Sequence, residues 1–141
     1  MRQFVSLRRL AEIPANRSLF AAPLLGAMGA CGFEPLHLWP LMLVGLAGLG
    51  ELVSRAGSAR RAALIGWLFG IGHFTLGNNW IATAFTYQAK MPGWLGWIAV
   101  VALSLYLAVY PALAALAAWR FFRANYGALV TGFAACWIVG E

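Results

Sequence analysis

The sequence predicts an all-α membrane protein, a bundle of about five apolar segments with its N-terminus in the cytoplasm. Three observations support this fold class. Of the 141 residues, 62% are hydrophobic and only 10% are charged, and the mean hydropathy is +0.77. The charged residues lie mainly between long apolar runs. The chain also has seven tryptophans and 16 glycines, and Trp is enriched at membrane interfaces while Gly is tolerated in spanning helices.

A soluble single domain is a poor alternative for this composition. Soluble domains have about 25% charged and 45–50% apolar residues. A chain of 141 residues could not hide so much apolar surface in one core, whereas lipid accepts apolar side chains directly. The remaining soluble alternative is a buried helical core inside a larger complex.

The first two runs follow a basic leader, residues 1–17. The run 18–33 is short and contains Pro23 near its start, so we expect it to be tilted, kinked or partly interfacial, because a span takes about 20 helical residues. The run 36–54 is long enough to cross. Its Pro40 lies near the first turn, where a missing N–H costs little.

Three more runs complete the predicted membrane domain, residues 18–141. The runs 62–85 and 94–119 are long enough to span, and Pro111 predicts a kink in the second of them. The last run, 128–141, reaches the end of the sequence.

The N-terminal region could also be a cleavable signal peptide, because a short apolar run follows basic residues. However, further runs of spanning length follow it, and the first run ends in Phe33-Glu34-Pro35, without a clear small-residue cleavage site. We therefore expect an uncleaved first segment.

The basic residues predict the orientation. Cytoplasmic loops collect Lys and Arg. The leader and alternate loops would share one side of the membrane, and the opposite side would have only Lys90. This places the N-terminus in the cytoplasm, and the localisation expected for a bacterial protein is the inner membrane. The residues on the cytoplasmic side would be Arg2, Arg8, Arg9, Arg17, Arg55, Arg60, Arg61, Arg120 and Arg123.

The high pI, about 10.2, does not indicate nucleic-acid binding. A phosphate-binding surface needs Lys and Arg gathered on one solvated face, and here they lie in short clusters at the ends of apolar runs. Cys31 and Cys136 lack metal or redox spacing, and no base is evident beside either, so both are interpreted as structural cysteines. We expect no nucleic-acid partner, no metal and no cofactor.

The run 62–85 has the clearest pattern. Spacings of four, three, four, three and four residues separate six of its positions and place them on one helix face. These positions are Gly66, Gly70, His73, Gly77, Trp80 and Ala84. One interpretation is helix packing, with small residues that admit a neighbouring backbone. The other is a polar, lipid- or substrate-facing cleft reaching the outer surface. The packing residues are Gly66, Gly70, Gly77 and Ala84; the cleft candidates are His73, Asn78, Asn79 and Trp80, with Lys90 and Trp94 from the next loop.

Two smaller features have structural interpretations. Phe33-Glu34-Pro35 and His37-Leu38-Trp39-Pro40 predict an outward turn before the second run. Glu51 and Arg55 are four residues apart, a spacing at which opposite charges pair on a helix. No Ser/His/Asp order, HExxH motif or Gly-rich phosphate loop is present, so no residue of this chain is a catalytic candidate.

Several short motifs, in order, resemble the opening of bacterial apolipoprotein N-acyltransferases. The similarity extends over about residues 19–141, and it depends on the order and spacing of individually weak motifs. These motifs are LGAMGACGFEP at 25–35, Trp39-Pro40, AALIGWLFGIGHFTLGNNW ending at Trp80, Met91-Pro92-Gly93, and Trp137-x-x-x-Glu141.

This resemblance implies an inner-membrane enzyme with an extracytoplasmic, nitrilase-like domain carrying a Glu-Lys-Cys triad. The triad cysteine would take an acyl chain from a phospholipid as a thioester and pass it to the N-terminal diacylglyceryl-cysteine of an apolipoprotein. A carboxylate base and an oxyanion-stabilising lysine suit acyl transfer. Membrane phospholipid and an apolipoprotein substrate would be the partners, and the process is lipoprotein biosynthesis.

In the family the catalytic domain follows the first membrane helices, and this sequence ends before it. Cys31, Cys136 and Lys90 do not match the triad. We therefore expect a fragment that is inactive by itself, from a truncated gene product or an incomplete sequence. Two alternatives remain open, a small multi-pass transporter or channel subunit and a non-catalytic membrane scaffold.

Overall fold

The computed structural model describes residues 15–33, 36–87, 91–122 and 124–140. Every element in this part of the chain is helical, which confirms the predicted all-α class. Arg2, Arg8, Arg9, Glu34, Pro35, Lys90, Arg123 and Glu141 lie outside the described residues. In chain order the helices are α2 (Ala15–Ala30), α3 (Trp39–Ser54), α4 (Ala59–Gly77), α5 (Trp80–Thr86), α6 (Gly93–Leu107), α7 (Val109–Phe122) and α8 (Tyr126–Gly140).

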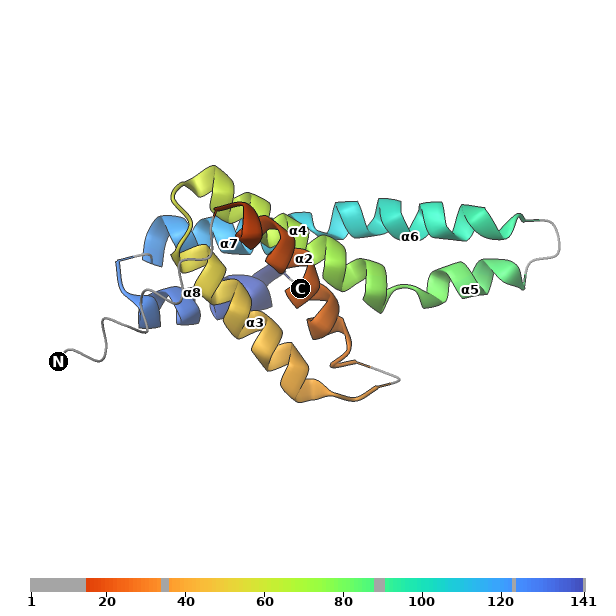
Figure 1. Ribbon diagram of the computed structural model, residues 1–141, viewed down its shortest axis with the longest axis horizontal. Helices are drawn as coiled ribbons and strands as arrows, with labels where there is room; N and C mark the ends of the chain where they lie inside the picture. The colour runs from red at the N-terminus through yellow and green to blue at the C-terminus, as the bar shows by residue number, and fades with distance from the viewer. Residues whose placement is uncertain (1–14, 34–35, 88–90, 123, 141) are drawn as a thin grey trace.

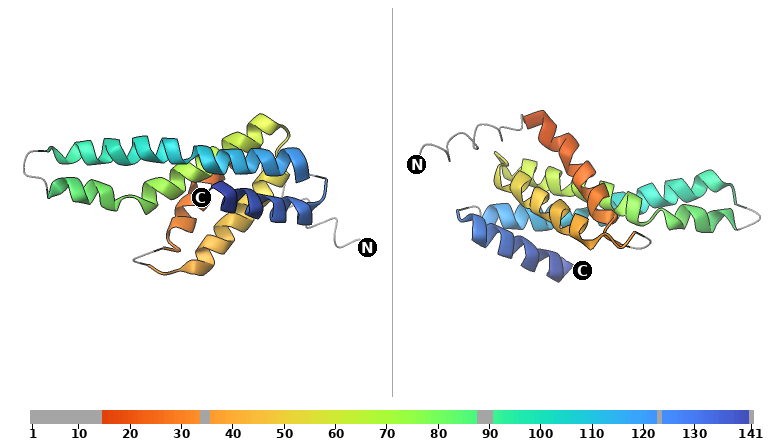
Figure 2. Two further views of the ribbon diagram at one scale, coloured as in Figure 1. Left: turned by 180° about the vertical axis from the view of Figure 1, so that it is seen from behind. Right: turned by 60° about the horizontal axis from the view of Figure 1, so that its bottom comes forward.

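Helix α4 is the centre of the arrangement, with its most extensive contacts to α2 and α7. Helices α3 and α8 complete the bundle, and α5 and α6 run side by side as a hairpin that projects away from it (Figures 1 and 2). Phe69, Leu49, Ile65 and Leu129 are the largest fully buried side chains. The core therefore lies among α3, α4, α7 and α8, and the hairpin forms a separate arm.

Local sequence explains where two of the helices begin, α4 and α3. The hydroxyl of Ser58 accepts a hydrogen bond from the backbone N–H of Arg61, at 3.3 Å, and so caps the start of α4. Pro40 is in the first turn of α3, as predicted, because its missing N–H would have no helical partner there. In the turn before α3, His37 has φ of 51°, a left-handed conformation in which His is enriched among non-glycine residues.

Two of the predicted runs contain helix breaks. The run 62–85 is divided at Asn78 and Asn79, which form a turn between α4 and α5. Asn has a low helix propensity, so a break at two successive asparagines is physically reasonable. The run 94–119 is interrupted at Ala108, three residues before Pro111. Proline removes one helical hydrogen bond and clashes with the carbonyl four residues earlier, which accounts for the interruption near Pro111.

Taken together across the break at Ala108, α6 and α7 form one helical stretch in the described part of the chain, Gly93–Phe121, that has 29 residues and is long and apolar enough to cross a membrane. Only 33% of its most apolar stretch is buried inside the bundle. Trp39–Ser54 and Gly127–Ile138 are also apolar but shorter.

Candidate functional site

His73 lies in a packed crossing between α2 and α4, not in an open cleft. It is 7% exposed, and its Nδ1 is 3.3 Å from the carbonyl oxygen of Gly26. Its ring stacks on Phe69, with centroids 6.0 Å apart, and meets the edge of Phe33 at 5.7 Å. Aromatic and hydrogen-bonding contacts therefore surround the histidine within the two-helix interface.

The close approach of these two helices depends on glycines that sequence reasoning did not single out. A Cβ on Gly26 would collide with the carbonyl oxygen of Phe69, and one on Gly72 with that of Pro23. Gly72 faces α2, whereas Gly66 and Gly70 face the opposite side of α4. One feature of the sequence could have identified this contact. Gly72 lies outside the four-and-three spacing of the predicted face, so it lies on a different side of the helix, where a second helix could approach.

The predicted packing face is divided by the helix break. A Cβ on Gly66 would lie 2.5 Å from the carbonyl oxygen of Pro111, and one on Gly70 would lie 2.8 Å from the Cα of Ala108. These two glycines therefore admit the α6–α7 junction. Nothing lies within 4 Å of a Cβ on Gly77, and Ala84 is exposed on α5. The structure brings together the first half of this face but not the second.

The remaining cleft candidates lie near or on the projecting hairpin. Asn78 is half-buried at the C-terminal end of α4, and Asn79 is exposed just before α5. Trp80 is 62% exposed at the start of α5, and Trp94 is 63% exposed at the start of α6. Lys90 lies outside the described residues. The structure therefore separates buried His73 from the exposed aromatic candidates, which suit an interfacial anchor.

Among the described residues, both cysteines have the structural surroundings expected from the sequence. Cys31 is half-buried, and its thiol donates to the carbonyl oxygen of Ala27 at 3.5 Å. Cys136 is also half-buried and free. Within the described ranges, no group of three His, Cys, Asp or Glu side chains is placed to hold a metal ion.

An apolar groove of about 350 Å³ lies between α3 and α8. Leu46, Phe133 and Trp137 are among its lining side chains. The Trp137 ring lies 5.8 Å from that of Phe133 and meets the edge of Phe69 at 6.4 Å. Trp137, one of the residues on which the family resemblance depends, therefore links the groove to the core.

The ion pair predicted between Glu51 and Arg55 is confirmed. The Arg55 guanidinium donates to the Glu51 carboxylate within the last turns of α3. Both side chains are about two-fifths exposed, at 43% and 40%, and an exposed pair of this kind contributes under about 1 kcal/mol.

Comparisons with known proteins give the family. The family model described as "Apolipoprotein N-acyltransferase N-terminal domain" matches residues 25–141. A protein named apolipoprotein N-acyltransferase from Ralstonia nicotianae is 38% identical over 138 residues, which covers 92% of this chain and 26% of the relative. Proteins of the same name from Nitrosomonas europaea and Chromobacterium violaceum are 37% and 36% identical, and each match covers 87% of this chain.

The chain spans about a quarter of the length of the curated relatives it matches, at 26%, 25% and 23% of those relatives. The comparisons do not favour the transporter or scaffold alternatives, because the relatives share the acyltransferase name. The family resemblance found in the sequence is therefore confirmed, and the chain belongs to the apolipoprotein N-acyltransferase family, of which it contains the N-terminal domain.

Proposed function

We propose that this chain is the membrane domain of an apolipoprotein N-acyltransferase of the bacterial inner membrane. The complete enzyme would transfer an acyl chain from a phospholipid to the N-terminal diacylglyceryl-cysteine of apolipoproteins. The observation that carries this proposal is the match of the family's N-terminal domain to residues 25–141. Within the enzyme, this domain anchors the catalytic part and forms the lipid-accessible floor beneath it.

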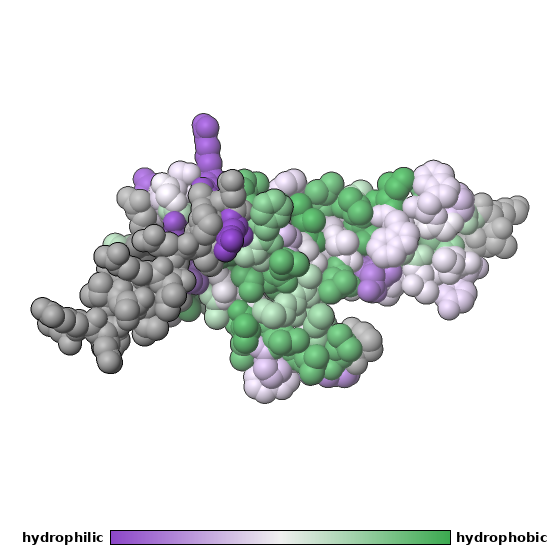
Figure 3. Space-filling view, viewed as in Figure 1, coloured by the Kyte–Doolittle hydropathy of each residue, from purple (hydrophilic) through white to green (hydrophobic). Residues whose placement is uncertain are grey.

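The surface of the protein supports membrane insertion. Large apolar side chains point outward from several helices, among them Phe20 at 74% exposed, Leu113 at 55% and Ile138 at 73%. Figure 3 shows hydrophobic residues over the middle of the molecule and most of the strongly hydrophilic ones toward its left-hand side. Soluble monomers rarely expose contiguous apolar patches larger than a few hundred Å², and a bilayer would cover this surface.

The proposed arrangement has five spans, residues 18–33, 36–54, 62–85, 94–119 and 128–141, after a cytoplasmic leader, residues 1–17. The arginines would face the cytoplasm. The α5–α6 hairpin would then point to the outer side, with Trp80 and Trp94 at the headgroups and Asn78 and Asn79 close to the interface. The catalytic domain of the enzyme would lie on this outer side. We therefore retain these residues of the hairpin region, with Lys90, as candidates for lipid or substrate contact.

A chimera tests the proposal. Residues 25–141 would replace the matching N-terminal segment of the Ralstonia nicotianae relative in cells depleted of their own apolipoprotein N-acyltransferase. We expect the chimera to restore N-acylation of lipoproteins, measured by mass spectrometry of their N-terminal peptides. The chain expressed alone should not restore it. A chimera that inserts into the membrane and accumulates normally but transfers no acyl chain would contradict the proposal.

A further inference from the structure

A second cavity lies on the basic side of the bundle, where α2, the end of α3 and the start of α4 meet. Its volume is about 290 Å³. The lining is divided in two: Arg55, Arg61 and Ser18 give it a polar part, and Leu52 and Ile65 give it an apolar part. The family resemblance and the proposed function assign no role to this cavity.

The Arg61 guanidinium is held in place at the cavity wall. Its Nη2 donates to the hydroxyl of Ser18 on α2, at 3.0 Å, and Ser18 is only 8% exposed. The backbone of Arg61 is also fixed, because its N–H donates to the cap residue Ser58. A preorganised guanidinium loses less side-chain entropy when it binds an anion than a freely moving one does.

The surroundings of the cavity favour an anion. The 19-residue helix α4 begins at Ala59, next to the part of the lining formed by Ala56 and Gly57, and a helix N-terminus carries partial positive charge. The described charged residues of this region are four arginines and one glutamate: Arg17, Arg55, Arg60, Arg61 and Glu51. Glu51 pairs with Arg55, and among the described residues no acidic side chain lines the cavity.

We propose that this cavity binds the phosphate of an anionic phospholipid in the cytoplasmic leaflet, and that the lipid ties α2 to α4. Arg61 and Arg55 would donate to phosphate oxygens, and the Leu52 and Ile65 side would receive the first methylenes of the lipid. The exposed apolar side chains of Phe20 and Leu24 on the neighbouring helix α2 would contact the acyl chains. A free phosphate would use only the polar part of the lining, which is why we assign a lipid. Basic pockets between helices at the cytoplasmic surface bind anionic headgroups in other membrane proteins.

This inference rests on the membrane placement proposed above, but separate experiments test the placement and the lipid binding, so that a failure of one can be distinguished from a failure of the other. Labelling in cells reports on placement, whereas lipid titration of the purified chain reports on binding at the cavity.

The test uses the full chain in a neutral detergent. Phosphatidylglycerol, phosphatidylcholine with the same acyl chains, and inorganic phosphate would each be titrated, with thermal unfolding and native mass spectrometry as readouts. We expect phosphatidylglycerol to raise the unfolding temperature and to remain bound, with an effect that weakens as salt rises. Phosphatidylcholine and inorganic phosphate should give neither response.

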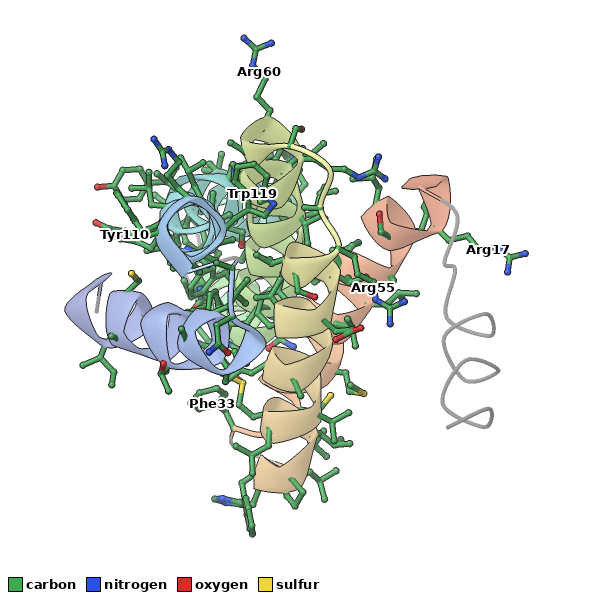
Figure 4. The ribbon with its side chains drawn as sticks, turned by 90° about the vertical axis from the view of Figure 1, so that its left-hand side faces the viewer. Arg17, Phe33, Arg55, Arg60, Tyr110 and Trp119 are labelled. Atoms are coloured by element: carbon green, nitrogen blue, oxygen red, sulfur yellow. The ribbon has the colours of Figure 1, made fainter. Side chains whose placement is uncertain are left out.

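Arg61→Gln should weaken phosphatidylglycerol binding about tenfold, the scale of one charge-assisted hydrogen bond. Arg60→Gln is the matched control, because Arg60 points away from the helices in Figure 4 and lies outside the cavity lining. It should bind phosphatidylglycerol like the parent chain. Equal losses for the two variants would contradict the proposal, since they would indicate a response to net charge alone.

A double variant covers the case in which Arg61→Gln does not fold. Glu51→Gln combined with Arg55→Gln removes an exposed pair and leaves the net charge unchanged. Weaker phosphatidylglycerol binding is expected, because one of the two cavity arginines is lost. Undiminished binding by this variant, or equal stabilisation of the parent chain by phosphatidylcholine or inorganic phosphate, would overturn the assignment of an anionic-lipid site.

Discussion

At the scale of single residues, His73 shows how burial changes an interpretation made from sequence. A histidine within an apolar run suggests a functional polar group, and His73 was therefore a candidate cleft residue. The structure surrounds it with Phe69, Phe33 and Phe74 and places its Nδ1 near the Gly26 carbonyl. These contacts give His73 a packing role between α2 and α4.

Substituting His73 separates packing from chemistry. His73→Phe keeps an aromatic ring and loses the contact with Gly26, so we expect a loss of about 1 kcal/mol in the free energy of unfolding. His73→Ala also removes the ring and should cost about 3 kcal/mol. Unfolding in mixed micelles measures both values. If His73→Phe abolished acyl transfer in the chimera while the chimera kept its stability, packing alone would not explain the role of His73.

The glycines of α4 offer a matched pair. Gly72→Ala places a methyl group against the Pro23 carbonyl, so the helices must separate, at a cost of about 1–3 kcal/mol. Gly77→Ala adds the same methyl group in open space, where helix propensity favours Ala over Gly by up to about 1 kcal/mol. We expect thermal unfolding of the purified chain to show a lower midpoint for the first variant only. Equal destabilisation by both would contradict the close contact between α2 and α4.

At the scale of helices, the apolar runs were predictable but their breaks were only partly so. The length of the apolar segments located the runs, and Pro111 predicted an interruption close to the one found at Ala108. The Asn78–Asn79 turn carried a weaker signal, since Asn is only mildly unfavourable in a helix. The predicted face from Gly66 to Ala84 assumed one continuous helix. Because the helix breaks at Asn78 and Asn79, the second half of this face does not contact the neighbouring helix that the first half contacts. The cavity beside Arg61 depends on three helices meeting, which no local pattern reveals.

Replacing Pro111 tests the origin of the α6–α7 junction. Pro111→Ala restores one N–H donor to the helix, and we expect the junction to straighten. Spin labels at Ile98→Cys and Phe121→Cys, two exposed positions, would report this change once Cys31 and Cys136 have been replaced by serine. The distance between them should increase toward about 35 Å, the value for a straight helix.

Pro40→Ala is the control for this experiment, because Pro40 lies in the first turn of α3 and should leave the α6–α7 distance unchanged. The same distance in the parent and Pro111→Ala chains would show that packing, and not the proline, sets the junction.

At the scale of the whole molecule, the orientation that we propose rests on the distribution of charge and apolar surface. Arg60 points outward from the start of α4, and Arg17 points outward beside α2 (Figure 4), while the α5–α6 hairpin projects from the bundle (Figure 1). In the arrangement that we propose, the bilayer covers the outward-facing apolar side chains between these two regions. In the account that we propose, this domain would hold a lipid-using enzyme at the membrane, in line with the family match.

Cysteine labelling in intact cells tests this central claim most directly. In a chain with Cys31 and Cys136 replaced by serine, Ser58→Cys would mark the basic end and Tyr87→Cys, at a side chain that is 84% exposed, would mark the tip of the hairpin. A membrane-impermeant maleimide should label the Tyr87→Cys variant in intact cells and the Ser58→Cys variant only after the inner membrane has been opened. Labelling of both variants in intact cells, of neither after lysis, or with the opposite sidedness would contradict the proposed membrane domain.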